Sequence, residues 1–373
     1  MSSWPTVRLG SAVSLVMGQA PAASDCNKEG RGTPFVKVGE FGLERPVIRE
    51  WTTDPKKLAR RTDVLICVVG ATCGKINLGI DCAIGRSAAA IRPKPEKLDQ
   101  RYLWYFMQGK VAEMRSGSQG AAQTVISREM INDVKIPLPS LEEQRRIVAA
   151  LDEAFAVIAT ATANAEKNLA SLEELLIATF RAAFGDPDAD WPTQPFEACI
   201  AKVKYPAKIQ RRDFKSHGMF PIISQEADFI NGYWDDPTHV LEVPRPLLVF
   251  GDHTQVLKYV DFDFVLGADG VKILLPNSFL DARFLLYFLK ANPMESKGYA
   301  RHYRHLKSLS VPVPPIDEQK RIAANLDDLA DAVNVLMGQI GAKLDLLDEF
   351  KQSFLHRAFT GELTADMPET IAA

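Results

Sequence analysis

The residues IPLPSLEEQRRI at 136–147 recur as VPVPPIDEQKRI at 311–322, 175 positions further along the chain. Each copy begins with a short run of apolar residues and prolines and continues with the spacing of a helix. Further matched pairs follow: Leu151-Asp152 with Leu326-Asp327, and Ala183-Phe184 with Ala358-Phe359. A repeat of this length predicts that the chain is a tandem of two related units.

Both copies are expected to open long helices. Ser140 and Glu143 are spaced as a capping box at the start of the first helix, and Gly185 and Gly361 are expected to end the two helices. At about 40 residues and about 1.5 Å per residue, each helix would be about 60 Å long. Mostly apolar residues recur at alternating steps of three and four in the first helix, and nearly so in the second: Ile147, Leu151, Phe155, Ile158, Thr162, Ala165, Leu169, Leu172 and Leu176, then Ile322, Leu326, Leu329, Val333, Leu336, Ile340, Leu344, Leu347 and Phe354.

One apolar stripe of this kind usually marks the buried face of a helix inside a single compact domain. Two matching stripes, each preceded by about 130 residues, instead favour helices that pack on each other as a rigid, coiled-coil-like spacer. The residues before each helix also resemble one another faintly. Three pairs carry that resemblance: 4–6 with 191–193, 101–106 with 283–288, and 64–70 with 247–251. This pattern predicts two modules of one fold with different loops.

The charge is distributed unevenly. The formal net charge is -3, but the helical segments 141–186 and 316–362 carry -4 each and the tail carries -2. The two blocks 1–140 and 187–315 therefore sum to +7. Positive charge gathers in the modules, where a polyanionic partner such as DNA would bind.

Composition limits the class of protein. A chain of 373 residues with 46% hydrophobic content is typical of a globular protein with two domains. We find neither about 18 uninterrupted apolar residues nor a basic and apolar leader, so a cytoplasmic protein is expected. The five cysteines lack a C-x-x-C pair, which argues against a disulfide framework or a zinc site.

The repeated helix openings, each after a variable block, resemble the specificity subunits of type I restriction-modification systems, and the resemblance covers essentially the whole chain. It implies an α+β fold with two globular target recognition domains, separated by two long antiparallel helices that form a coiled-coil spacer with an internal pseudo-twofold repeat. The expected parts are recognition domain 1 (1–140), the first spacer helix (141–185), recognition domain 2 (186–315), the second spacer helix (316–362) and a tail (363–373).

The resemblance also implies partners. Double-stranded DNA would be read as an asymmetric bipartite target, with two modification (methyltransferase) subunits and further restriction (motor-nuclease) subunits bound to the chain. No membrane contact is expected. The partners would carry S-adenosylmethionine, ATP and Mg, with no cofactor, metal or catalysis on this chain. Partner contacts are expected at the helix openings and ends: Gln144, Arg145, Gln319, Lys320, Phe184 and Phe359.

Several segments are candidates for DNA contact. The segment 68–76 looks like the family's strand followed by a glycine loop; its glycine spacing and Ile76 do not fit a nucleotide P-loop. A glycine turn that only joins strands is the plainer interpretation, and a loop that brings Thr72 and Lys75 to DNA is the alternative. The loops at 117–127 and 298–307 lie where the family has a glycine-led loop against DNA, and a solvated basic loop is the plainer reading of the second.

Glutamine can bond adenine and arginine can bond guanine in the major groove, while other polar and basic groups bind phosphates. The candidate residues are Thr72, Lys75, Ser118, Gln119, Gln123, Thr124, Ser127, Lys208, Arg211, Arg212, Arg301, His302, Tyr303, Arg304, His305 and Lys307.

The chain lacks the motifs of an amino-methyltransferase. Asp235-Asp236-Pro237-Thr238 has neither the second proline nor the aromatic residue that holds a flipped base, and no glycine-rich loop for S-adenosylmethionine follows a strand. The sequence therefore favours a non-catalytic DNA reader. The alternatives are a coiled-coil scaffold that reads no DNA sequence, the reader of a methylation-only system, and an enzyme with unrecognised motifs.

Overall fold

The computed structural model describes residues 4–116, 125–185, 190–268, 270–294 and 301–365. It separates into two compact units: unit 1 comprises Met1–Asn164 and Lys343–Ala373, and unit 2 comprises Ala165–Ala342. Two long helices, α3 (Leu141–Phe184) and α7 (Ile316–Thr360), each continue from one unit into the other. The compact units thus divide the chain differently from the linear domains expected from the sequence, because each unit takes part of both helices.

Unit 1 contains two small sheets. Strands β2, β10, β7 and β8 form an antiparallel sheet, and strands β3, β5, β4, β9 and β6 form a second sheet in which β4 and β9 are parallel. The α-helices are α1 (Gln100–Ser116), α2 (Arg128–Asp133), the first part of α3 and the last part of α7. The strands are β1 (Thr6–Arg8), β2 (Val13–Met17), β3 (Cys26–Asn27), β4 (Thr33–Val36), β5 (Trp51–Thr52), β6 (Leu58–Ala59), β7 (Val64–Cys67), β8 (Ile76–Leu78), β9 (Cys82–Ile84), β10 (Ala88–Pro93) and β11 (Lys135–Pro137).

Unit 2 repeats this topology, except that β3 has no counterpart among the described strands of unit 2. Sheet β13-β20-β17-β18 corresponds to β2-β10-β7-β8, and sheet β15-β14-β19-β16 corresponds to β5-β4-β9-β6, again with one parallel pair. Its shorter α-helices are α4 (Phe196–Cys199), α5 (Ala282–Ala291) and α6 (Tyr303–Leu306). The strands are β12 (Thr193–Pro195), β13 (Ile200–Ala201), β14 (Phe220–Ile223), β15 (Gly232–Trp234), β16 (Val240–Leu241), β17 (Leu247–Gly251), β18 (Leu257–Val260), β19 (Phe264–Leu266), β20 (Val271–Pro276) and β21 (Ser310–Pro312).

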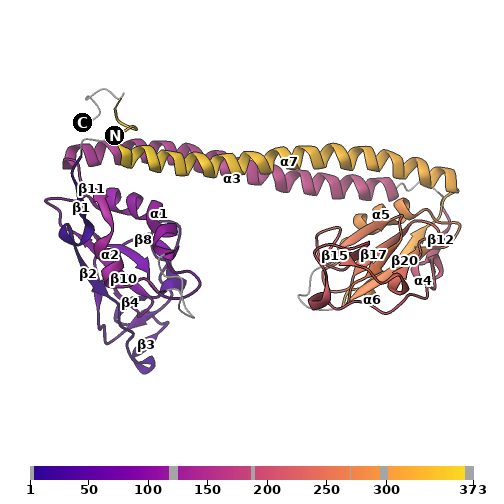
Figure 1. Ribbon diagram of the computed structural model, residues 1–373, viewed down its shortest axis with the longest axis horizontal. Coiled ribbons are helices and arrows are strands. Elements are labelled where there is room, and N and C mark those ends of the chain that lie inside the picture. Colours follow the sequence, from indigo (N-terminus) through magenta and orange to yellow (C-terminus); the bar gives the residue numbers. More distant parts are fainter. Residues whose placement is uncertain (1–3, 117–124, 186–189, 269, 295–300, 366–373) are drawn as a thin grey trace. The chain divides into compact units, whose positions relative to one another are not determined.

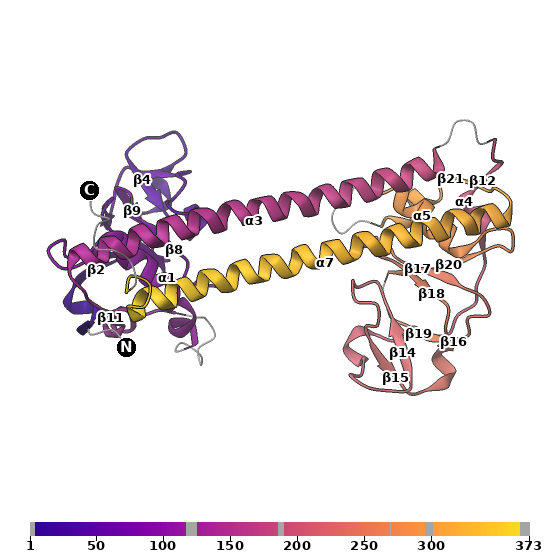
Figure 2. The same ribbon diagram turned by 90° about the horizontal axis from the view of Figure 1, so that it is seen from above.

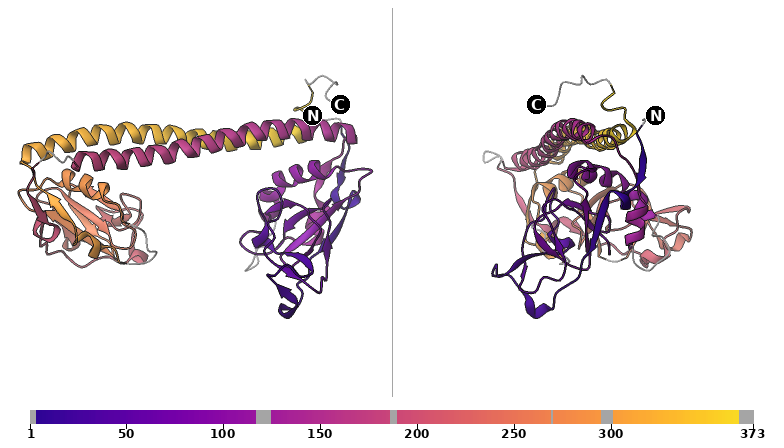
Figure 3. Two further views of the ribbon diagram at one scale, coloured as in Figure 1. Left: turned by 180° about the vertical axis from the view of Figure 1, so that it is seen from behind. Right: turned by 90° about the vertical axis from the view of Figure 1, so that its left-hand side faces the viewer.

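The same layers build both units. In unit 1, α1 lies between the four-stranded sheet and the long helices (Figure 1), and in unit 2 α5 occupies the corresponding position (Figure 3). The stretch before each long helix is a strand that pairs with the start of its module: β11 with β1, and β21 with β12. The faint resemblance between the 4–6 and 191–193 segments is therefore structural, since both lead into these ribbons.

The long helices run antiparallel within each unit, where they lie side by side (Figures 1 and 2). In unit 1 the core contains Ile147 and Leu151 near the start of α3, together with Leu355 and Ala358 near the end of α7. In unit 2, Phe180 near the end of α3 packs into one core with the start of α7. The expected α+β fold with long spacer helices is thus confirmed.

The helix boundaries follow from local chemistry. Ser140 Oγ accepts a hydrogen bond from Glu143 N (3.2 Å), as the predicted capping box requires. The Glu143 carboxylate does not return the bond; it binds Arg146 (2.8 Å) and accepts from the Thr364 hydroxyl. At the other end, Gly361 has φ of 84°, and the amides of the next two residues bond Arg357 O. Glycine therefore ends α7 because the left-handed conformation suits it.

Helix α3 also has the length and composition of a membrane span, because an 18-residue window within it has a mean hydropathy of 1.4. In the structure the two ends of α3 contribute apolar side chains to the cores of the two units. Only 22% of the apolar window is buried within the chain, so packing accounts for the ends of α3 and most of the window lies at the surface.

Candidate nucleic-acid interface

The turn between β7 and β8 in unit 1 contains the predicted glycine loop. Gly70 and Gly74 have positive φ values of 96° and 91°, and Gly74 N donates to Cys67 O (2.8 Å). A Cβ atom at Gly74 would lie 2.6 Å from Val111 Cγ1, so glycine also lets the turn approach α1. A P-loop leads into a helix. This turn leads into the strand β8 instead.

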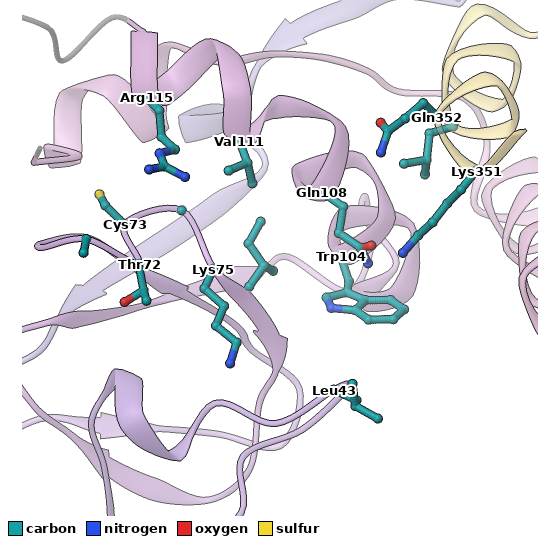
Figure 4. Close-up of a pocket in the computed structure, with 14 residues that line it drawn as sticks. Leu43, Thr72, Cys73, Lys75, Trp104, Gln108, Val111, Arg115, Lys351 and Gln352 are labelled. Atoms are coloured by element: carbon teal, nitrogen blue, oxygen red, sulfur yellow. The ribbon is translucent and has the colours of Figure 1, made fainter. Parts of the chain in front are cut away.

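Thr72 and Lys75 are both exposed on this turn. Lys75 Nζ donates to Phe41 O (2.6 Å), which fixes the side chain against the neighbouring loop. Both residues line a cleft of about 520 Å³ between the turn, α1 and α7 (Figure 4). Arg115 and Lys351 add two further cations, and no acidic residue is among those that line the cleft. The cleft is therefore suited to a negatively charged or acceptor-rich partner.

The corresponding turn in unit 2 connects β17 to β18. Gly251 N donates to Val256 O (2.9 Å), and Gln255 adopts a positive φ of 61°. A Cβ at Gly251 would lie 2.2 Å from Thr254 Oγ1, so the turn closes only around glycine. The cleft at the equivalent place, about 440 Å³, is lined mainly by apolar side chains such as Leu176, Ile177 and Met294. The two units thus share a glycine turn closed by a backbone hydrogen bond, and the side chains that line the neighbouring cleft differ between them.

In both units this turn meets the segment that precedes the last short strand. Val69 forms a β-bridge with Val125 in unit 1, and Ile126 N donates to Val68 O (2.9 Å). In unit 2, His302 N donates to Asp252 O (2.9 Å), and Tyr303 N donates to Asp252 Oδ1 (2.8 Å). The structure therefore brings together the two segments that the sequence indicated separately.

The segment 301–307 of unit 2 presents several basic groups. Arg301 and Arg304 are exposed, and His305 is half-buried. Tyr303 is half-buried between cations, with Lys272 Nζ and Lys307 Nζ 5.5 and 5.7 Å from its ring centre. Lys307 also pairs with Glu197 (2.7 Å), and this hydrogen bond raises the pKa of the lysine, which keeps it positively charged.

One candidate in this segment needs correction. The side chain of His302 is 1% exposed, and its Nδ1 lies 3.0 Å from Asp252 O. Direct DNA contact by His302 is therefore excluded in this conformation; the ring supports the turn instead.

Two further candidates have structural roles. Lys208 is half-buried and donates to Val271 O (2.8 Å). Ser127 caps α2 by accepting from Met130 N (3.2 Å). Four candidates from the first loop lie outside the described residues: Ser118, Gln119, Gln123 and Thr124.

Arg211 and Arg212 lie on a short 3₁₀ turn before β14 and are widely exposed. Their side chains are 78% and 86% exposed, and their contacts to Glu226 and Asp213 are long, at 3.8 and 3.7 Å. Such pairs hold their charges weakly, so both guanidinium groups remain accessible to another anion.

The residues predicted to bind partner subunits divide into two groups. Arg145 and Lys320, at equivalent positions of the repeat, are exposed. Phe184 packs against aromatic rings of α5, and Phe359 packs against aromatic rings of α1. These two rings are half-buried in their own units.

The prediction for Gln144 and Gln319 is wrong in its chemistry, because both side chains are completely buried. Each accepts a bond from the residue that caps the module helix, Asp99 N or Asp281 N, at 2.8 Å. Each amide nitrogen also donates to two backbone carbonyls. These glutamines join helix to module and leave nothing free for a partner.

One further set of contacts was not predicted from the sequence. Asp152 on α3 binds Arg101 and Tyr105 of α1, and Asp327 on α7 binds the corresponding pair on α5. The signal was present, because Asp152 with Asp327 and 101–106 with 283–288 had each been recognised as repeats. What the sequence did not give was the pairing between them.

The two modules share one topology, and each has basic side chains near a turn that contains glycine. This arrangement is expected of a protein that binds DNA at two places. The model of the type I restriction modification DNA specificity domain matches residues 1–170 and 200–346. The chain therefore belongs to the type I restriction-modification DNA specificity family.

Named relatives agree with this. The chain is 35% identical over 152 residues to the putative type I restriction enzyme MjaX specificity subunit of Methanocaldococcus jannaschii, a match that covers 40% of this chain and 36% of that protein. It is 18% identical to the MjaVIII specificity subunit of the same organism, covering 96% of this chain and 93% of the relative. The EcoBI specificity subunit of Escherichia coli is 22% identical, covering 97% and 87%.

Solved structures show the same fold. A chain from a type I restriction-modification system, solved to explain complex assembly and conformational transition, superposes with a TM-score of 0.77 at 21% identity, covering 96% of this chain and 98% of that one. The HsdS subunit of Thermoanaerobacter tengcongensis gives a TM-score of 0.50 at 20% identity, with coverage of 96% and 97%.

We expect the exposed arginines of unit 2 to bind phosphates. The double variants Arg211→Ala with Arg212→Ala, and Arg301→Ala with Arg304→Ala, should each lower the affinity for DNA. Each lost phosphate contact should also reduce the slope of log affinity against log salt by about 0.9. Binding to labelled duplex at several salt concentrations, in the complex with the modification subunits, measures both effects.

The control is Arg321→Ala, which removes an exposed arginine on α7. A slope equal to that of the unaltered chain in both double variants would remove these arginines from the interface.

Proposed function

We propose that this chain is the DNA-reading subunit of a type I restriction-modification enzyme, and that it directs adenine methylation or restriction by partner subunits at an asymmetric bipartite target. The observation that carries the proposal is the duplicated module: two domains of one topology, each with a turn that contains glycine between corresponding strands. The names of its relatives support the role, since they are specificity subunits of restriction enzymes.

Each module would read one half of the target. The glycine turns and the segments beside them differ in sequence between the units, and the neighbouring clefts differ in polarity. Two readers with different side chains recognise two different half-sites, so the target would be asymmetric. The residues that we propose for DNA contact are Thr72, Lys75, Arg211, Arg212, Arg301, Tyr303, Arg304, His305 and Lys307.

The test is to map methylated adenines in a host that carries this gene with its modification partner. We expect one bipartite sequence, with one half-site changed when residues 1–140 are exchanged for those of another family member. A change in both halves would show that the modules do not read independently. Methylation without sequence preference would support a scaffold instead, and DNA modification by the purified chain alone with S-adenosylmethionine would show an enzyme.

The long helices would set the gap between the half-sites. α3 and α7 have 44 and 45 residues, or about 66 Å at about 1.5 Å per residue. A continuous helix resists bending, so its length would fix which spacer the complex accepts.

Removing one heptad from each helix, 161–167 and 339–345, should shorten the preferred spacer while leaving the half-sites unchanged. The deletion removes about 10 Å and keeps the apolar seam in phase. Because each base pair also turns the duplex, we expect a shift of about one to three base pairs. The methylation rate on duplexes with graded spacers measures the shift, and deletion of one heptad from α3 alone is the mismatched control. An unchanged optimal spacer length would refute the proposal that the long helices set the gap between the half-sites.

Two modification subunits, and restriction subunits on that core, are the proposed partners. Arg145 and Lys320 are exposed at equivalent places, and the helices also expose apolar side chains that a partner would cover. The most exposed of these are Val157, Leu175, Val335, Leu336, Leu346 and Phe350.

Phe350→Ser should weaken assembly with the modification subunit, because Phe350 is 56% exposed on α7. Removing an aromatic anchor from an interface typically costs about 2 kcal/mol or more, which is roughly thirtyfold in affinity. Analytical ultracentrifugation of the mixed subunits measures it. Phe229→Ser, at 45% exposure in a module loop, is the control, and equal assembly by both variants would place the partner elsewhere.

Catalysis would belong to the partners, with S-adenosylmethionine, ATP and Mg bound there. Among the described residues, no group of three His, Cys, Asp or Glu side chains is placed to hold a metal ion. The complex would act in the cytoplasm, where DNA is reached. A reader of a methylation-only system would use the same subunit, and the presence of a restriction subunit in the purified complex decides between the two.

A further inference from the structure

Each module helix packs against the long helices through apolar side chains and is also hydrogen-bonded to one of them at two points that match between the units. In unit 1 the first point is Gln144, whose buried amide binds the backbone around the start of α1. The second is Asp152, eight residues later, which accepts from Arg101 Nη2 (2.6 Å) and from the Tyr105 hydroxyl. Burial and the bond to Asp152 raise the pKa of Tyr105, so the phenol remains a donor.

Unit 2 reproduces both points. Gln319 binds the start of α5, and Asp327, again eight residues later, accepts from Arg283 Nη1 (2.5 Å) and from Tyr287 Oη (2.6 Å). Arginine and tyrosine stand four residues apart in both helices, so they share one helix face. The residues between them differ, Tyr-Leu-Trp in unit 1 and Phe-Leu-Leu in unit 2, while the donors and the acceptor are the same.

Two points of hydrogen bonding define an orientation more narrowly than one point does. Eight residues of helix span about 12 Å. Gln144 binds only the start of α1, and the apolar core that holds α1 against α3 and α7 makes no directional bonds. The second bond, one turn further along α1 and two turns further along α3, adds a directional restraint on how α1 turns against α3.

The arginine of each pair also reaches into the module. Arg101 forms a second ion pair with Glu44 (2.7 Å), which lies in the loop beside the glycine turn. Arg283 stacks over Tyr259 of β18, 4.9 Å from the ring centre. Each bridge therefore links the long helix to an element next to the glycine turn of its module, the Glu44 loop beside β8 in unit 1 and β18 in unit 2.

Stability alone does not account for these bridges. The Arg101 and Asp152 side chains are 37% and 39% exposed, and those of Arg283 and Asp327 are 49% and 26% exposed. Ion pairs with this much water contact add little to the free energy of unfolding. Their directional bonds can nevertheless hold an angle.

We propose that Asp152 and Asp327 are positioning residues that set the angle of each recognition module on its spacer helix, and so the spacing and phase of the half-sites that the complex accepts. This inference rests on the proposed bipartite reading of DNA. Without the bridge the module would still fold and still read its half-site, but it would tolerate a wrong spacer.

The test uses the full complex with modification subunits and duplexes whose spacer varies by one base pair at a time. Asp152→Ala, Asp327→Ala and the double variant are compared with Glu153→Ala and Asp328→Ala, which remove a neighbouring exposed acid from the same helices. We expect the unaltered complex and both controls to lose about tenfold or more in methylation rate one base pair from the optimum. The aspartate variants should lose about threefold or less there, a difference within what loss of a charge-assisted hydrogen bond can produce.

Tyr105→Phe and Tyr287→Phe keep each ring and remove one donor, so they provide a milder version if an aspartate variant does not fold. They should broaden the spacer preference in the same direction. A folded complex with a sharp, unchanged spacer preference in the aspartate or tyrosine variants overturns the positioning role while leaving bipartite reading intact. Indifference to spacer length in the unaltered complex overturns the proposed function itself, and the positioning role with it.

Discussion

The architecture depends on two buried glutamine side chains. Each long helix begins after a proline-rich stretch, where backbone carbonyls have no helical partner, and each module helix begins at an aspartate cap nearby. The buried side chains of Gln144 and Gln319 bond to both stretches at once. Each amide oxygen accepts a hydrogen bond from the capping aspartate's backbone N–H, and each amide nitrogen donates to two backbone carbonyls. A buried amide without these partners would be costly. The bonds therefore specify how a helix of 44 or 45 residues leaves a small mixed domain.

The sheets and helices of the two modules are more alike than the turns that connect their strands. Strand order, the parallel pair in each second sheet and the aromatic packing of Phe184 and Phe359 agree between units. The turns share glycine geometry only in outline: two positive-φ glycines in unit 1, but the non-glycine residue Gln255 in unit 2. The sheets and helices of the two modules agree because packing constrains their residues. The glycine turns lie at a surface where a partner, and not internal packing, sets the requirement, so they can differ between the modules.

The sequence predicted most of the scaffold, because its signals are local and repeated. Helix spacing, prolines and end glycines located both long helices to within two residues of their observed ends at Phe184 and Thr360. The site was harder to predict. The pattern marked Gln144 and His302 as contact residues because they lie in motif or basic segments, but burial depends on tertiary packing that spacing does not encode. The bridges to Asp152 and Asp327 were missed because hydrogen-bonded pairs 40 to 51 residues apart leave no periodic trace.

The division of the chain into units has a consequence for how the protein emerges from the ribosome. Unit 2 is one contiguous stretch, Ala165–Ala342, whereas unit 1 needs Lys343 and later residues from the far end of the chain. Leu355 and Ala358, which are buried in its core, are synthesised roughly 200 residues after the α3 residues they meet. The first module to be made is thus the last to be completed, and until α7 is finished its apolar face stays open to chaperones or to a neighbouring nascent chain.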